Sequence, residues 1–292
     1  NRVGSPRHRT LIEAGLSARV LGWIQRREDL ALGSRHLGLV MASEVHPGPD
    51  HGAVFEECCD LDAILELARA APGIPEPEPL PPAKGGLARI TVALDAAFCF
   101  TYQENLDRLA RAGAGLAFFS PLSDPLPDVE GLYLPGGYPE LHAEGLSASP
   151  FLRGLRAACK DGMPVYGECG GLIVLSESLS AEGKEIPMAR VLPARATLTG
   201  KVQALGYVEA RATAAAAILP PGLVIRGHEF HYSDVILDPG TRYAYRITRG
   251  LGIHEGLDGA LVRCTLGSYT HLHPLASLGM FRAFVEACRG RR

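Results

Sequence analysis

Residues 165–172 read VYGECGGL, and this stretch decides both the fold and the candidate chemistry. A short apolar strand enters a tight G-x-C-G-G turn and continues into a helix, which is the cysteine counterpart of the nucleophile elbow. Glycines are needed on both sides of Cys169 because the backbone of an elbow is strained and side chains would collide there. The positive end of the following helix favours the thiolate over the thiol. The pattern predicts Cys169 as a nucleophile and the backbone N–H of Gly170 as an oxyanion donor.

Strands and helices alternate on both sides of this elbow. We predict strands at 89–95, 116–119, 131–134 and 164–166, and helices at 103–112, 150–161 and 170–178. Such alternation predicts a parallel sheet with helices on both faces. Residues 197–269 are rich in strand patterns, and a final helix is predicted over 275–288. The chain is therefore expected to belong to the α/β class.

A proline-rich stretch separates this part from the N-terminal residues. Residues 72–86 read PGIPEPEPLPPAKGG, with six prolines in fifteen residues. Proline fixes φ and removes a backbone donor, so the stretch is predicted to be an extended linker. Residues 1–71 show a shorter α/β pattern, with helices predicted at 5–20 and 60–71 and strands at 20–27 and 35–41. Such a segment is small for an independent domain, because small α/β units leave strand edges exposed.

Composition excludes several classes of protein. Lys plus Arg number 29 against 32 for Asp plus Glu, so no broad basic surface is available for nucleic acid or an anionic membrane. No apolar run approaches the ~18–20 residues of a membrane span, and no secretory signal is recognisable. The seven cysteines show no CxxC pairs, which favours free thiols in a reducing cytoplasm.

Two further segments offer partners for the thiol. In GSYTHLHP, residues 267–274, strand alternation places His271 and His273 on the same side, at a strand end before the terminal helix. His271 is therefore a candidate base. In LPGGYP, residues 134–139, a Gly-Gly pair ends a buried strand, and the N–H of Gly137 is a candidate second oxyanion donor. Taken alone, this turn is common and its specificity is low.

The segment GHEFHY at 227–232 carries two more histidines. If it is a strand, Glu229 and His231 share one face, while His228 lies on the other. The spacing differs from H-E-x-x-H, the helical pair of zinc proteases. A metal site built from His228, His231, His271 and His273 is the weaker alternative, and no metal is predicted.

The combination of LYLPGGYPELHA, VYGECGGL, LGYVEA, RGHEFHYS and GSYTHLH closely resembles the glutamine amidotransferase domain of the cobyrinic or hydrogenobyrinic acid a,c-diamide synthases. The opening segments NRVGSPRHRTLIEAG, VLGWIQRR and RHLGLV resemble the second half of that family's synthetase domain. The resemblance implies a flavodoxin-like class I amidotransferase domain at 87–292, after a linker at 72–86. It also implies that residues 1–71 are the C-terminal part of a P-loop-type, dethiobiotin-synthetase-like α/β domain.

The resemblance also implies a glutamine-hydrolysing carbon–nitrogen ligase of cobalamin biosynthesis. Cys169 would attack the glutamine amide, form a glutamyl thioester and release ammonia. His271 would activate the thiol and protonate the leaving ammonia, while Gly137 and Gly170 hold the oxyanion. The ammonia would pass to a synthetase domain, where ATP with Mg²⁺ activates the a and c carboxylates of the corrin ring.

This sequence departs from the family pattern at the base. Related class I glutaminases carry His-Pro-Glu, in which the glutamate orients the histidine, but position 273 is histidine here. A Cys–His dyad, or a triad completed by another residue, is therefore implied. Glu229 is the nearest acidic candidate by motif.

A second departure concerns ATP. No G-x-x-x-x-G-K-[ST] string occurs in the 292 residues, so nothing supplies the usual phosphate cradle. This chain is expected to bind no cofactor alone and to perform at most the glutaminase half-reaction. Asn1 resembles the family's segment near the adenine, and the chain resembles the C-terminal part of a longer enzyme. The expected partners are glutamine, the corrin substrate, a missing N-terminal synthetase part and a second copy of the chain.

Two other kinds of protein could carry such an elbow. A cysteine hydrolase of small substrates would turn over esters or peptides with no requirement for glutamine. A non-catalytic module would bind a corrinoid or a partner protein whether or not Cys169 is present.

Overall fold

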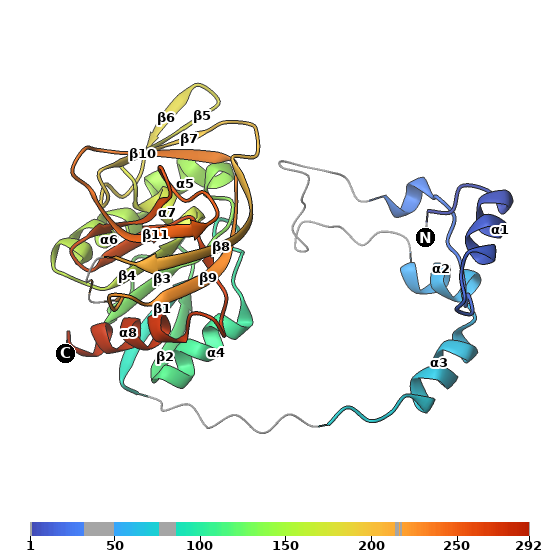
Figure 1. Ribbon diagram of the computed structural model, residues 1–292. Helices are drawn as coiled ribbons and strands as arrows, with labels where there is room; N and C mark the ends of the chain where they lie inside the picture. The colour runs from blue at the N-terminus through green and yellow to red at the C-terminus, as the bar shows by residue number, and fades with distance from the viewer. Residues whose placement is uncertain (1, 32–49, 76–85, 214–215, 217, 292) are drawn as a thin grey trace. The chain divides into compact units, whose positions relative to one another are not determined.

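The computed structural model describes residues 2–31, 50–75, 86–213, 216 and 218–291. The chain forms two compact units, Asn1–Pro79 and Leu80–Arg292. Figure 1 shows the helices and strands of each unit. No helix in the described ranges is long and apolar enough to cross a membrane.

The first unit is built from short capped helices. They are α1 (Pro6–Ala14), the 3₁₀ turn η1 (Glu28–Leu30), α2 (His51–Cys58) and α3 (Leu61–Ala70). Each α-helix begins at a polar cap whose side chain accepts a backbone N–H of the first turn: Ser5, Asp50 and Asp60. The third helix is predicted from the sequence and α2 is not. The helix predicted over 5–20 is wrong at its end, since α1 stops at Ala14 with Gly15 as its C-cap.

The predicted strand at 20–27 is wrong. Within it, Gly22 and Gln25 form only isolated bridges, to Cys59 and Val3, so no ladder develops among the described residues. The predicted strand at 35–41 lies outside the described residues, as do Asn1 and most of the proline-rich stretch.

A ten-stranded mixed sheet forms the centre of the second unit, in the order β14-β9-β8-β11-β12-β13-β4-β3-β1-β2. Its parallel part consists of β1 (Ala88–Ala93), β2 (Ala114–Phe119), β3 (Gly131–Leu134), β4 (Val165–Glu168) and β13 (Thr265–Ser268). Its antiparallel part consists of β8 (Ala204–Ala212), β9 (Val224–His231), β11 (Arg242–Arg249), β12 (Leu257–Val262) and β14 (His271–Leu272). Five strands of the strand-rich C-terminal segment, together with β13, therefore extend the same sheet that carries the elbow, whereas β10 (Ser233–Leu237) joins a second sheet.

Helices cover both faces of the parallel part, as predicted (Figure 1). One face packs against α5 (Ala143–Ala148), α6 (Pro150–Lys160) and α7 (Gly170–Leu175), with the turn η4 (Pro139–His142) beside them. The other packs against α4 (Gln103–Ala112) and α8 (Leu278–Arg289). α4 ends as predicted, because Gly113 adopts φ 111°, a left-handed conformation that favours glycine.

A second sheet follows the elbow helix. It has the order β10-β7-β5-β6, formed by β5 (Ser178–Ala181), β6 (Lys184–Pro187), β7 (Ala194–Leu198) and β10 (Ser233–Leu237). The helix predicted over 170–178 is wrong at its end, since α7 stops at Leu175. Ser176 is extended there, and its Oγ donates to the carbonyl oxygen of Ile173 and also reaches that of Ser178. The chain therefore turns from the helix directly into β5.

Candidate functional site

Cys169 lies at a strained turn between β4 and α7. Its φ of 46° and ψ of −96° are unusual for a residue with a side chain. Space restricts the positions around it: a Cβ on Gly171 would collide with the carbonyl oxygen of Leu134, and one on Gly167 would lie 3.0 Å from the backbone carbonyl carbon of Gly171. This geometry is that of the elbow predicted from the sequence, with the thiol at the C-terminal end of a central parallel strand.

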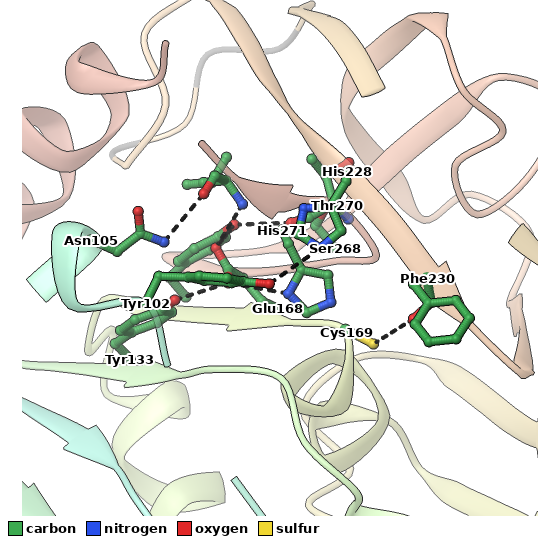
Figure 2. A network of polar contacts seen from close by, with 12 residues as sticks. Tyr102, Asn105, Tyr133, Glu168, Cys169, His228, Phe230, Ser268, Thr270 and His271 are labelled. Carbon is green, nitrogen blue, oxygen red and sulfur yellow. Dashed lines mark hydrogen bonds and ion pairs between the residues drawn. The ribbon is translucent and has the colours of Figure 1, made fainter. Parts of the chain in front are cut away.

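Backbone contacts fix the turn on both sides. The N–H of Cys169 donates to the carbonyl oxygen of Ser268 at 2.7 Å, at the end of neighbouring β13. The Sγ lies 3.8 Å from the carbonyl oxygen of Phe230 in β9 (Figure 2). The nucleophile candidate is therefore held between two strands that are distant in sequence.

The two predicted oxyanion donors come together. A Cβ on Gly170 would lie 3.1 Å from the backbone N of Gly137, so the two backbones are in contact. At Gly137 a Cβ would collide with the carbonyl oxygen of Ala97, and only glycine fits. Both backbones adjoin Cys169, because Gly170 follows it directly.

His271 is buried on β14, only 3% exposed. Its ring stacks on His228 at 4.9 Å between centroids, and the Nε2 of His228 contacts the hydroxyl of Tyr102 at 3.2 Å. Figure 2 shows the His271 ring between Cys169 and Glu168. Burial lowers the pKa of His271, but hydrogen bonding and charge interaction with Cys169 and Glu168 outweigh it and raise that pKa to about 10. The direction of this shift favours the protonated imidazole beside the sulfur, although Nδ1 itself makes no hydrogen bond to the described residues.

Glu168 is the acidic residue that the structure places against His271. One carboxylate oxygen lies 3.7 Å from His271 Nδ1, the distance of an ion pair. The fully buried carboxylate also accepts the hydroxyls of Tyr133 at 2.9 Å and Tyr166 at 3.0 Å and the N–H of Leu272 at 3.2 Å. Sequence reasoning missed this residue. The available signal was a carboxylate at the end of a buried strand, directly before the cysteine.

Glu229, the acidic candidate expected from the sequence, does not lie against His271. Its buried carboxylate accepts the N–H groups of Leu251 at 2.7 Å and Gly252 at 3.0 Å. Strand alternation turns it away from the face on which neighbouring His228 meets His271. The structure thus brings Glu168, and not Glu229, to the histidine.

The remaining histidines have separate surroundings. His231 donates from Nδ1 to the carbonyl oxygen of Ser233 at 2.8 Å and stacks on Tyr269, and burial lowers its pKa to about 4. His273 lines a different groove of about 300 Å³, together with Arg226 and Arg249. In the part of the chain that the structure describes, no group of three or more His, Cys, Asp or Glu is placed to hold a metal ion.

Gly227 in β9 seats the strand that carries His271. It pairs with Leu272, and a Cβ there would collide with the carbonyl oxygen of His271. We expect Gly227→Ala to lower the free energy of unfolding by ~1–3 kcal/mol, the usual cost of overpacking, as measured by urea denaturation. Gly206→Ala in neighbouring β8 is the control, because a Cβ there meets nothing within 4 Å. Equal stabilities of the two variants would contradict this account of the β9–β14 contact.

Comparisons with known proteins agree with this geometry. The model of the CobB/CobQ-like glutamine amidotransferase domain matches residues 89–278. The chain is 43% identical over 270 residues to the cobyrinate a,c-diamide synthase of Halobacterium salinarum, covering 91% of this chain and 59% of that protein. It is 37% identical over 303 residues to the same-named protein of Salmonella typhimurium, covering 99% and 66%. The chain thus spans less than two thirds of each relative.

Two solved structures share the fold at low sequence identity. The structure of PurLQS from Thermotoga maritima has a TM-score of 0.51 at 15% identity, covering 68% of this chain and 97% of that one. A crystal structure of a glutamine amidotransferase also has a TM-score of 0.51, at 18% identity, covering 68% and 98%. These likenesses show the fold alone.

Proposed function

Because this chain belongs to the CobB/CobQ-like glutamine amidotransferase domain family, we propose that its second unit hydrolyses glutamine to glutamate and ammonia. One observation carries the proposal: a strained, glycine-flanked Cys169 adjoins a buried His271 that Glu168 approaches from the other side. The residues form a Cys–His–Glu triad in which the acidic member directly precedes the nucleophile.

The proposed reaction begins at the thiolate. The sulfur of Cys169 attacks the side-chain amide carbon of glutamine, a C–S bond forms, and the carbonyl electron pair moves to oxygen. The N–H groups of Gly137 and Gly170 stabilise that oxyanion. As it collapses, the C–N bond breaks and the leaving nitrogen takes the proton held by His271, which releases ammonia. Water then adds to the thioester, giving a proton to His271, and glutamate leaves as the thiolate is restored.

Glu168 is proposed as a positioning residue. Its charge favours the protonated form of His271, and the hydrogen bonds from the two tyrosine hydroxyls fix the carboxylate in place. Burial and the nearby carboxylate raise the pKa of Tyr133 and Tyr166 well above the ordinary value, so both phenols remain donors. A fixed carboxylate on one side of the imidazole leaves the other side for the thiol and the leaving group.

At the level of the whole enzyme, we infer that the ammonia serves amidation of the a and c carboxylates of a corrin precursor, as the names of the relatives suggest. We assign residues 87–292 to the glutaminase, 72–86 to the linker and 1–71 to part of the synthetase. The described residues of the first unit form helices without a strand ladder, and the sequence holds no phosphate-loop string. We therefore propose that ATP and Mg²⁺ act in the complete synthase and that this chain alone binds neither. We also propose a reducing, cytoplasmic location, because the seven cysteines show no CxxC pairs and no disulfide-scaffold spacing.

A diazoketone analogue of glutamine provides the direct test. It should alkylate Cys169 in the purified chain and be excluded by excess glutamine but not by asparagine, as measured by peptide mass spectrometry. Because labelling needs only binding and attack, it is informative even where turnover is slow. Hydrolysis of simple esters with no protection by glutamine would favour a cysteine hydrolase. No labelling at Cys169 would favour a non-catalytic binding module.

A further inference from the structure

Asp258 is a second buried carboxylate that the reaction above does not use. It lies in β12, is fully buried, and accepts five hydrogen bonds. The donors are the N–H of Gly259 at 2.7 Å, Tyr269 N–H at 3.2 Å, Thr270 N–H at 3.3 Å, Ser268 Oγ at 2.8 Å and Thr270 Oγ1 at 2.9 Å. Four of the five donors belong to residues 268–270, so the carboxylate holds the turn between β13 and β14.

The turn at residues 268–270 is joined to the backbones of both Cys169 and His271. At its start, the carbonyl oxygen of Ser268 accepts the N–H of Cys169 at 2.7 Å. At its end, Thr270 is followed directly by His271. The distance between nucleophile and base therefore depends on the conformation of three residues, and Asp258 binds each of them.

We propose that Asp258 is a positioning residue that sets the geometry of Cys169 relative to His271 by clamping residues 268–270. The inference rests on the proposed function and adds a residue to it. The clamp acts through the backbone, and none of the five hydrogen bonds of the carboxylate goes to a reacting side chain.

The number of donors explains why a carboxylate is used. Three of the five are backbone N–H groups, which cannot reverse their direction. An ionised carboxylate has acceptor sites only and can satisfy all of them, whereas an amide would turn an NH₂ group toward donors. Burial raises the pKa of Asp258, and the hydrogen bonds oppose that rise. Asp258→Asn is therefore a nearly isosteric change that breaks the clamp on one side.

The test measures geometry without glutamine. The rate at which iodoacetamide alkylates Cys169 is followed by peptide mass spectrometry from pH 5 to 10 in wild type and Asp258→Asn. We expect the variant to react more slowly and with a changed pH profile. Its kcat for glutamine should fall ~10- to 100-fold with KM nearly unchanged, the size expected when a reacting group is displaced by about 1 Å. Inactivity of the wild type toward glutamine would contradict the proposed function alone, because alkylation still reports the clamp.

Glu229→Gln is the matched control. Glu229 is equally a buried carboxylate bound to backbone N–H groups, but its recorded bonds go to Leu251 and Gly252. It should lower stability and leave the alkylation profile of Cys169 unchanged. If Asp258→Asn fails to fold, Ser268→Ala removes one arm of the clamp and should change the profile in the same direction. Wild-type profiles in the folded Asp258→Asn or in Ser268→Ala would overturn the proposal.

Discussion

Replacing Cys169 with alanine is expected to lower glutamine hydrolysis by ~10⁴-fold or more, the loss typical of removing a nucleophile. The sulfur forms the covalent bond to substrate, and the neighbouring oxyanion donors can provide only a small residual rate without it. Glutamate release from glutamine, followed by a coupled assay, measures the effect. In a complete synthase carrying the same change, amidation with ammonium salts should continue, because free ammonia bypasses the thioester.

Cys159→Ala controls for loss of any buried thiol. Cys159 packs in α6 on one face of the sheet, and burial raises the pKa of its thiol to about 11, so it has little thiolate at neutral pH. This variant should hydrolyse glutamine like the wild type. Glutamine-dependent turnover that survives Cys169→Ala would show that another group is the nucleophile.

The parts of the site that were predicted are those encoded by local sequence. The elbow needs glycines close to Cys169 on both sides. The close contacts that a Cβ would make at Gly167 and Gly171 explain why the pattern can be recognised within eight residues. The same holds for Gly137, where only glycine fits against Ala97. The backbone atoms that would collide belong to Leu134 and Ala97, which lie in other parts of the chain, so the packing itself is not local. What a single stretch of sequence contains is the glycine pattern that such a crowded turn requires.

The carboxylate that the sequence does not identify, Glu168, depends on distant strand pairing. Glu168 meets Leu272 across 104 residues, and it does so because β13 pairs in parallel with β4 in the register Ser268 to Glu168. By motif, Glu229 is the nearest acidic candidate instead. A shift of one residue along a strand reverses the face on which a side chain lies, so motif proximity cannot identify the partner of His271.

The boundaries of helices and strands also divide into those set by local sequence and those set by distant pairing. Helix α4 was predicted at both ends because its apolar spacing and Gly113 act locally. The end of α7 was not predicted, because the chain becomes extended at Ser176 and enters β5 two residues later. The partners of β5 in the sheet, β6 and β7, lie later in the chain. The four-residue strands β5 and β6 are too short for a periodic pattern to appear. Tertiary pairing, and not local propensity, determines these boundaries.

Glu168→Gln is the second large effect expected. It keeps the size of the side chain but removes the charge that faces His271, and we expect kcat for glutamine to fall ~10²-fold, within the range for loss of a general acid or base. The wild-type pKa of His271 is raised to about 10 by Cys169 and Glu168 against the opposing effect of burial. Without the carboxylate this pKa moves down, so the imidazolium that protonates the leaving nitrogen is lost at lower pH. The alkaline limb of the kcat profile should shift toward neutral pH.

The raised pKa of His271 also determines how the free energy of unfolding depends on pH. A histidine whose pKa is raised on folding stabilises the native state fully below its ordinary value of 6.5, and that contribution disappears as the pH rises to about 10. In Glu168→Gln the pH-dependent part of the unfolding free energy should therefore shrink, as measured by urea denaturation at pH 6 and pH 9. Tyr133→Phe is the control, since it removes one hydrogen bond to the carboxylate and keeps the charge. If Glu168→Gln left both the pH–rate profile and this stability difference like the wild type, the acidic partner of His271 would have to be sought elsewhere, because an uncoupled carboxylate 3.7 Å away is incompatible with the proposed triad.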